Sequence, residues 1–271
     1  YTMGVLDVFL EAGITFDYVC GVSGGALCAV NYLAGQYGRT VSVNLRYLHD
    51  KRYMSLNSLV MNKAYFNLEF LFSSTVESWY PLDDIHYEKN PTRFEVGITD
   101  LSTGEIDFVP KPVRDDFAPI VATASVPFLA RPIEIGGRLY LDGGIGDSIP
   151  YQRALDLGCT SLVVVTTQDH DYRKQPLSGR TKQFIRQWYR KYPRFAQTLM
   201  ARNDVYNQTK AAIATLAEKG QLLLLEPLRK VEVSRAEQNK NKLIDLYQEG
   251  VDETIHRLDM IVEYLKQAGK D

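Results

Sequence analysis

The order of hydrophobic and polar residues alternates between helical and strand spacing along the first half of the chain. Apolar side chains recur at helical spacing over residues 5–10, and Gly13 favours the end of a helix. Residues 14–20 are mostly apolar and lie between two glycines, which predicts a short buried strand. The mostly apolar residues 26–34 predict a buried helix that follows this strand closely.

The pattern continues through the middle of the chain, where glycine and proline mark the ends of the elements. It predicts a pair of strands over 94–100 and 105–109, a helix over 117–124, a strand over 138–141 and a strand over 162–166. The last of these is an unbroken β-branched run, which is typical of a parallel strand covered on both faces. Helices and strands that alternate in this way predict a three-layer α/β domain.

The C-terminal third has a different character, because residues 172–203 contain nine basic residues and no acidic one. One face of a predicted helix gathers apolar side chains beside a basic stripe; the face is Ile185, Trp188, Tyr189 and Tyr192, and the stripe is Lys182, Arg186 and Arg190. Such a face either contacts an anionic lipid surface or packs on the protein's own core, which is the more ordinary use of aromatic residues. A strongly patterned helix is predicted over 242–268.

The composition excludes several classes of protein. With 31 basic and 33 acidic residues, the formal net charge of −2 disfavours a general nucleic-acid-binding protein. No apolar run reaches the roughly 18 residues that a membrane-spanning helix needs. The three cysteines form no C-x-x-C pair, so we expect neither a disulfide framework nor a metal site, and no cofactor. We expect a cytoplasmic protein, peripheral to a membrane if the basic segment binds lipid.

Residues 21–25 read Gly-Val-Ser-Gly-Gly and match the pattern G-x-S-x-G between a predicted strand and a predicted helix. In that context the pattern predicts a nucleophile elbow, in which Ser23 stands on a sharp turn beside the amide donors of a helix N-terminus. One alternative is a tight turn with Ser23 as an N-cap. Another is a phosphate cradle, although no basic residue follows until Arg39.

A serine nucleophile needs a base, and the chain offers two kinds of candidate. His170 follows the predicted strand over 162–166, where a histidine of a catalytic triad could lie, although a surface loop histidine is the commoner case. Asp142 ends the predicted strand over 138–141 and is followed by Gly143 and Gly144, which permit close approach. Asp-Gly-Gly alone is more often a plain turn.

Together the two glycine-rich motifs resemble those of the patatin-like phospholipase family. Further stretches that fit the resemblance are 1–13, 96–100, 122–128 and 143–150. The likeness covers residues 1 to about 170 and is greatest with the bacterial branch that carries a helical C-terminal region. It implies a three-layer α/β fold with a mostly parallel central sheet. It also implies a serine-dependent acyl hydrolase for lipid esters, of the phospholipase A or lysophospholipase type.

By this resemblance Ser23 is the nucleophile and Asp142 its activating base in a Ser–Asp dyad, through an acyl-enzyme. Gly21, Gly24 and Gly25 belong to the elbow and oxyanion region, and Gly143 and Gly144 form the turn after the base. A catalytically silent lipid-binding module with the same fold, or a triad esterase that uses His170, is the alternative.

The family's first strand and glycine-rich oxyanion loop precede the first helix, so we expect them upstream of Tyr1, where a secretion signal also stays open. We divide the chain into a catalytic domain over 1–170 and a second region over 171–271. That region holds the basic-aromatic helical segment, one short strand and a C-terminal helix. Near the motifs, Asp100 and Asp147 are interpreted as surface or turn residues, and Cys20 and Cys28 as buried thiols.

Overall fold

The computed structural model describes residues 1–50, 52, 74–113, 116–234 and 237–268. Its strands are β1 (Tyr18–Gly21), β2 (Arg93–Asp100), β3 (Ile106–Pro110), β4 (Ile133–Ile135), β5 (Arg138–Asp142), β6 (Val163–Val165) and β7 (Leu223–Leu225). The helices of the first part are α1 (Thr2–Glu11), α2 (Gly24–Leu33), α3 (Arg39–Tyr47), α6 (Ser74–Trp79), α7 (Asp84–Lys89), α8 (Ala118–Thr123), the 3₁₀ helix η2 (Gly143–Ile145) and α9 (Tyr151–Asp156). The C-terminal part adds α10 (Gly179–Trp188), α11 (Pro193–Glu218), α12 (Lys240–His256) and α13 (Leu258–Ala268).

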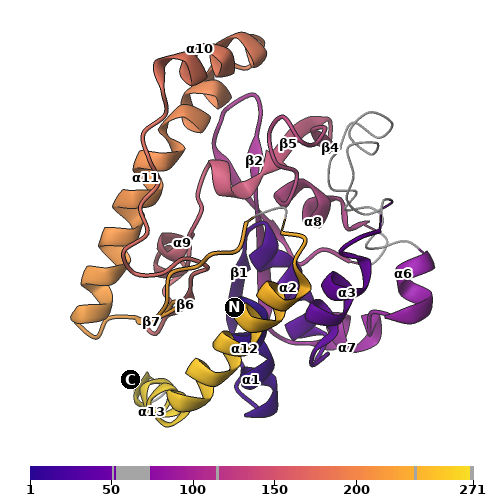
Figure 1. Cartoon of the computed structure of the whole chain (residues 1–271), viewed down its shortest axis with the longest axis vertical. Helices are drawn as coiled ribbons and strands as arrows, with labels where there is room; N and C mark the ends of the chain where they lie inside the picture. Colours follow the sequence, from indigo (N-terminus) through magenta and orange to yellow (C-terminus); the bar gives the residue numbers. More distant parts are fainter. Residues whose placement is uncertain (51, 53–73, 114–115, 235–236, 269–271) are drawn as a thin grey trace.

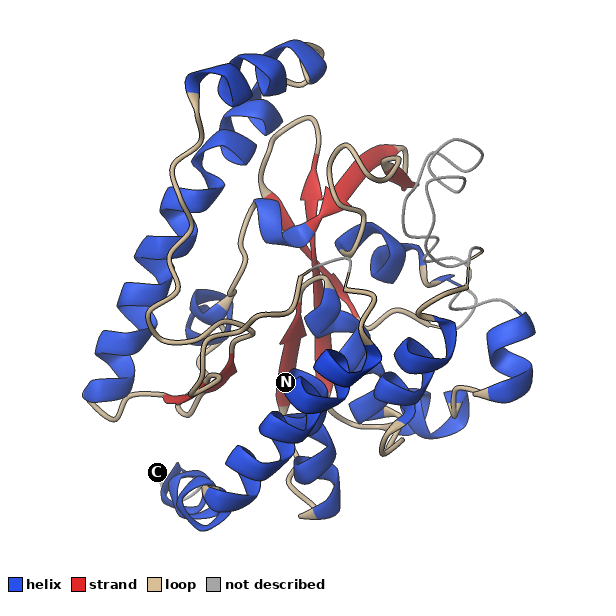
Figure 2. Cartoon of the chain, in the orientation of Figure 1, coloured by secondary structure: helices blue, strands red, loops and turns tan. Residues whose placement is uncertain are grey.

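The main sheet runs through the middle of the molecule, with the long helix α11 along one side and α3 and α8 on the other, and the small sheet of β6 and β7 lies on the α11 side (Figures 1 and 2). The predicted α/β class is therefore confirmed. The main sheet is mixed: β1 pairs with β2 in parallel, whereas the pairs β2–β3, β2–β5 and β4–β5 are antiparallel. Short turns join β2 to β3 and β4 to β5, and a short turn can only connect antiparallel neighbours. The predicted strand over 162–166 is parallel, but it pairs with β7 in a separate two-stranded sheet.

The register places the ends of β1 and β5 against each other. Glu95 and Val96 of β2 pair with both β1 and β3, and Ile98 and Thr99 pair with both β3 and β5. A strand residue has one neighbour on each edge, so β1 and β5 share the edge of β2 that lies opposite β3. Because β1 runs parallel and β5 antiparallel to β2, their C-terminal ends converge beside Gly97.

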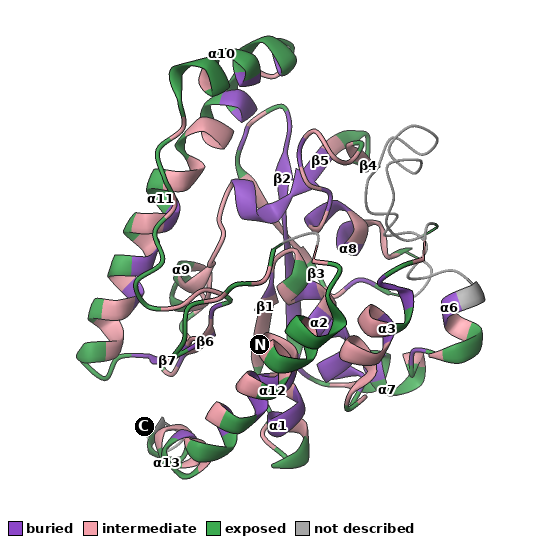
Figure 3. Ribbon diagram, viewed as in Figure 1, coloured by how far each residue is buried: buried purple, intermediate pink, exposed green. Residues whose placement is uncertain are grey.

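The core fills the space between this sheet and its helices. Strand β2 is buried along nearly its whole length, whereas α10 is largely exposed (Figure 3). The main cluster of buried side chains combines α1, α2, β2, α8 and α13, with Phe9, Leu33, Phe94 and Ile261 among its fully covered members. Strand β1 and helix α2, which flank Ser23, therefore both pack against this main cluster.

The C-terminal region differs from the expectation of one helix over 242–268, because the chain breaks into α12 and α13 at Arg257. The guanidinium of Arg257 donates to the carbonyl of Leu224 in β7 at 3.1 Å. The break lets α12 pack on α1 while α13 turns toward the small sheet, where the hydroxyl of Tyr264 contacts the backbone of Leu162. Among the described helices, none combines the length and apolar character needed to cross a membrane.

Candidate active site

Ser23 occupies a strained turn between β1 and α2. Its backbone has φ 53° and ψ −127°, a region that L residues with a side chain rarely adopt. The turn is sharp because the start of α2 folds back over β1: a Cβ on Gly21 would lie 2.6 Å from Cα of Ala26. The side chain of Ser23 makes no capping bond to α2, which argues against the N-cap interpretation.

Asp142 lies at the end of β5 and is 7% exposed. Its Oδ1 accepts a hydrogen bond from the amide of Gly144 at 2.8 Å, and its own amide donates to the carbonyl of Ser125 at 2.9 Å. The hydroxyl of Thr99 donates to the carbonyl of Asp142 at 2.9 Å. One carboxylate oxygen is thereby fixed to the turn, and the Asp-Gly-Gly segment is both a turn and the support of a functional group.

The second carboxylate oxygen faces the elbow. Oγ of Ser23 donates to Oδ2 of Asp142 at 3.1 Å, across the point where β1 and β5 converge. This O–H···O distance is longer than the usual 2.7–2.8 Å, as is common for catalytic pairs without substrate. The arrangement gives a hydroxyl on a strained turn and a buried proton acceptor within hydrogen-bond reach, which are the parts of a nucleophile and its base.

The glycines around the pair divide into two groups. A Cβ on Gly143 would overlap the carbonyl of Gly97, and a Cβ on Gly144 would lie 3.1 Å from Oδ1 of Asp142. By contrast, a Cβ on Gly24 or Gly25 would meet no described atom within 4 Å. Close packing therefore requires glycine at Gly21 and Gly143. At Gly24 and Gly25 packing does not require glycine, because the space at their Cβ positions is open.

The structure adds a residue that sequence reasoning gave no role. Thr123, at the end of α8, is fully buried; its Oγ1 accepts from the amide of Ser23 at 2.9 Å and donates to the carbonyl of Gly97 at 2.5 Å. It therefore ties the elbow to β2 at the point of convergence. The segment 122–128 was part of the family resemblance, and a threonine inside it was the only signal available.

The other candidates lie elsewhere or serve the turns. His170 is exposed, and its Nδ1 contacts Oε1 of Glu226 at 3.0 Å, beside the small sheet. Asp100 is buried and not a surface residue; it accepts from the backbone of Ser102 and pairs with Arg138 at 2.7 Å, which fixes the β2–β3 turn. Asp147 accepts from the amide of Ile149 at 3.0 Å, also a turn role, and burial raises the pKa of its carboxyl.

The two thiols that flank the elbow are poor nucleophiles. Burial raises the pKa of Cys20 and of Cys28 to about 12. Both thiols are therefore protonated near neutral pH, and the thiolate is the reactive form. Cys28 is buried, as interpreted from the sequence, whereas Cys20 is half-buried.

Comparisons with known proteins assign parts of the chain. A family model described as "Patatin-like phospholipase" matches residues 1–155, which is more than half of the chain. A second, described as a domain of unknown function, DUF6363, matches residues 192–266. The chain is also similar to "Uncharacterized protein YjjU" of Escherichia coli (strain K12), 26% identical over 182 residues. That match covers 62% of this chain and 48% of the relative, so the chain spans about half of the relative's length. The division of the chain at residue 170 stays a prediction.

Proposed function

Because the chain belongs to the patatin-like phospholipase family, we propose that it hydrolyses lipid esters with Ser23 as the nucleophile and Asp142 as its base. One observation carries the proposal: the hydroxyl of Ser23, on a strained turn, donates to the buried carboxylate of Asp142 at 3.1 Å. A lipid acyl hydrolase of the phospholipase A or lysophospholipase type fits both the family and this pair.

The proposed reaction uses the hydrogen bond between Ser23 and Asp142. As Oγ of Ser23 attacks the ester carbonyl carbon, its proton passes to Oδ2 of Asp142. The tetrahedral intermediate collapses, the carbon–oxygen bond to the leaving alcohol breaks, and that oxygen takes the proton from Asp142. Water then attacks the acyl-serine and gives a proton to Asp142. Finally the carboxylic acid leaves, and Oγ of Ser23 takes the proton back.

The amide of Gly24 is the oxyanion donor closest in the chain to the nucleophile. It follows Ser23 directly at the start of α2, where the helix dipole also favours negative charge. The amide of Ser23 itself is bonded to Thr123. The open space beside Gly24 gives an ester carbonyl access to this position.

The test is covalent labelling of the intact protein with a fluorophosphonate, followed by mapping of the labelled peptide. We expect labelling at Ser23, and loss of labelling and of ester hydrolysis by roughly 10³-fold or more in Ser23→Ala and in Asp142→Asn. The double variant should be little worse than either single one. His170→Gln is the matched control and should retain most activity.

Each alternative predicts a different outcome of the same experiment. A catalytically silent lipid-binding module gives no labelling of the wild-type protein. A triad esterase gives labelling that disappears in His170→Gln. Full turnover by Asp142→Asn would exclude Asp142 as the base.

We propose in addition that the protein contacts anionic lipid through the segment 172–203. The predicted aromatic face is divided: Ile185 and Tyr189 are buried against the core, whereas Trp188 is 59% exposed. The ring of Phe128 packs against Phe184, which is 52% exposed, at a tilt and a centroid distance of 5.3 Å. It packs edge-to-face against Trp188 at 5.6 Å. The exposed rings that we propose for lipid contact therefore differ from the face that helical spacing predicted, since Phe128 comes from a different part of the chain.

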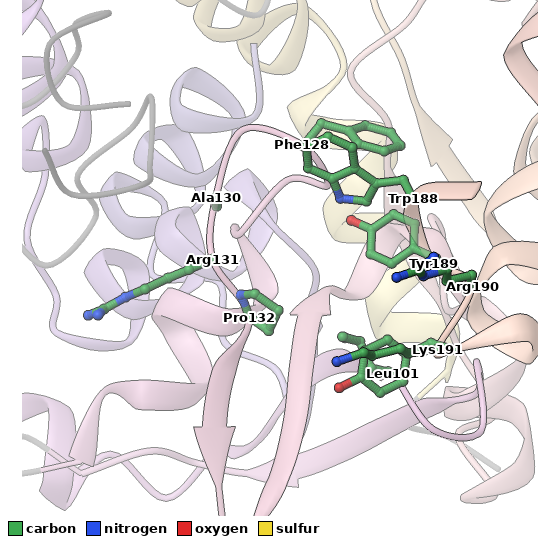
Figure 4. Close-up of a pocket in the computed structure, with 10 residues that line it drawn as sticks. Leu101, Phe128, Ala130, Arg131, Pro132, Trp188, Tyr189, Arg190 and Lys191 are labelled. Atoms are coloured by element: carbon green, nitrogen blue, oxygen red, sulfur yellow. The ribbon is translucent and has the colours of Figure 1, made fainter. Parts of the chain in front are cut away.

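The location of these rings supports lipid contact near the candidate active site. Phe128 is close in the chain to Ser125, whose carbonyl accepts a hydrogen bond from the amide of Asp142. The rings of Phe128 and Trp188 line a cavity of about 610 Å³, and Arg190 and Lys191 line it as well (Figure 4). Aromatic side chains beside cations suit the boundary between lipid headgroups and acyl chains.

Co-sedimentation with vesicles that contain phosphatidylglycerol, at low and high salt, tests this contact. Neutralising Lys182, Arg186 and Arg190 should weaken binding by about 1 kcal/mol per charge. Trp188→Ala should weaken it at both salt concentrations. Binding that is absent at low salt, or unchanged by the triple variant, would assign the segment a structural role only.

A further inference from the structure

The region matched by the domain of unknown function contacts the turn that carries the candidate base. Its first helix, α11, lies along one side of the molecule (Figure 1), and Nε of Arg202 donates to the carbonyl of Gly144 at 2.5 Å. The same carbonyl accepts from Oγ of Ser148 at 2.7 Å. Gly144 is also the residue whose amide holds Oδ1 of Asp142.

This contact is part of a packing interface between α11 and the domain that carries Asp142. Arg194, Thr198 and Arg202 are spaced four residues apart and therefore lie on one face of α11. The first two pack against the β2–β3 turn: a Cβ on Gly104 would lie 2.8 Å from the carbonyl of Arg194 and 2.7 Å from Oγ1 of Thr198. Around them the buried side chains of α11 share a cluster with those that flank the Asp-Gly-Gly turn; its members include Leu141, Ile145, Phe195 and Ala196.

The guanidinium of Arg202 also lies close to the carboxylate. A point at the Cβ position of Gly144 is 3.1 Å from Oδ1 of Asp142 and 3.4 Å from Nη2 of Arg202. A hydrogen bond from a charged guanidinium to a carbonyl is stronger than one between neutral groups. Arg202 thus holds a residue whose amide fixes the carboxylate.

We propose that the C-terminal region completes the active site, with Arg202 as the positioning residue for the turn that carries Asp142. The inference rests on the proposed role of Asp142 as the base. In this proposal Arg202 acts through Gly144: by fixing the residue whose amide holds Oδ1 of Asp142, it fixes the orientation of the carboxylate. Because a small misplacement of a catalytic group lowers the reaction rate by a large factor, loss of the Arg202 contact should measurably lower kcat.

Paired variants on one helix separate positioning from general structure. Arg202→Gln removes the charged fork, Arg202→Lys keeps the charge, and Arg194→Gln makes the same change at an exposed side chain of α11. We measure kcat and KM with a soluble ester, the rate of fluorophosphonate labelling, and the midpoint of thermal unfolding.

We expect Arg202→Gln to lower kcat and the labelling rate about 10- to 100-fold with KM within twofold, and Arg202→Lys to retain more activity. Arg194→Gln should resemble the wild type. Adding methylguanidinium to Arg202→Ala should restore part of kcat, which a lost packing contact would not allow. Equal kcat for Arg202→Gln and Arg194→Gln, or a loss that follows the unfolded fraction alone, would overturn the inference. Wild-type labelling of Ser23→Ala would instead overturn the proposed function.

Discussion

The elbow of Ser23 and the turn of Asp142 stand at opposing strand ends, yet they are built in contrasting ways. At the elbow the backbone is strained, with φ 53° at Ser23, and the positions of Gly24 and Gly25 adjoin open space. At the aspartate turn Asp142 has an ordinary negative φ of −44°, but Gly143 lies directly against β2 and the carboxylate is fixed by Gly144. The side of the proposed nucleophile Ser23 is left accessible, and the side of the proposed base Asp142 is enclosed.

This difference fits the two tasks. A nucleophile must reach a substrate carbonyl and leave room for a tetrahedral intermediate. A carboxylate that is to accept a proton benefits from burial and from a fixed orientation, because both limit its solvation by water.

The largest effect is expected from Gly143→Ala. The new Cβ would overlap the carbonyl of Gly97, so β2 or the turn must move. We expect ester hydrolysis to fall to background and the free energy of unfolding to drop by about 3 kcal/mol. Gly25→Ala is the matched control, because its Cβ meets no described atom and alanine favours the helix by about 0.5–1 kcal/mol. Urea unfolding compares the two; equal stabilities would mean that the turn is not closely packed.

Thr123→Val probes the support of the strained elbow. Valine keeps the shape of threonine but leaves the amide of Ser23 and the carbonyl of Gly97 without the bonds that Oγ1 makes. Each buried group left unpaired costs about 1–3 kcal/mol. We expect fluorophosphonate labelling to slow about tenfold and stability to fall by about 2–3 kcal/mol, while Thr123→Ser retains both. Normal labelling by the valine variant would show that the elbow holds its shape without Thr123.

The sequence predicted the strands that carry the pair, but not how they meet. The motif at residues 21–25 and the Asp-Gly-Gly turn are local patterns, and the α/β class follows from alternating elements. Their convergence beside Gly97 depends on pairing between strands far apart in the chain, which no local pattern contains. Arg202 was counted among the basic residues of a lipid-binding segment, because a charge pattern does not reveal that one cation turns inward to Gly144.

The hydrogen bonds and the ion pair that link β1, β2 and α9 through Glu95 are expected to break in acid. Glu95 of β2 accepts from the hydroxyl of Tyr18 in β1 and pairs with Arg153 of α9. Burial alone would raise the pKa of Glu95, but hydrogen bonds from Arg153, Arg93 and Tyr18 outweigh it and lower the pKa to about 2.

Since an unfolded glutamate titrates near pH 4.3, the stability from Glu95 is complete above about that pH and is lost as the pH falls toward 2. At about 1.4 kcal/mol per pKa unit, this difference corresponds to about 3 kcal/mol of stability from ionised Glu95. Glu95→Gln should flatten the acid limb of a stability–pH curve from urea unfolding, whereas Glu105→Gln, at an exposed position, should leave it unchanged. An unaltered acid limb in Glu95→Gln would assign acid unfolding to other carboxylates.

The smallest effect is expected from alkylation of Cys20 and Cys28, the two thiols near Ser23. Because burial raises the pKa of Cys20 and Cys28 to about 12, their thiolate population at pH 7.5 is roughly 10³-fold below that of a free cysteine with a pKa near 8.5. Iodoacetamide should therefore modify both residues slowly in the folded protein, rapidly in urea, and with a rate that rises with pH beyond 9. Fluorophosphonate labelling at Ser23 should persist through the treatment. Rapid alkylation at pH 7.5 with parallel loss of labelling would mean that solvent reaches the inner side of the elbow, and the open space would then extend past Ser23 into the layer between β1 and α2.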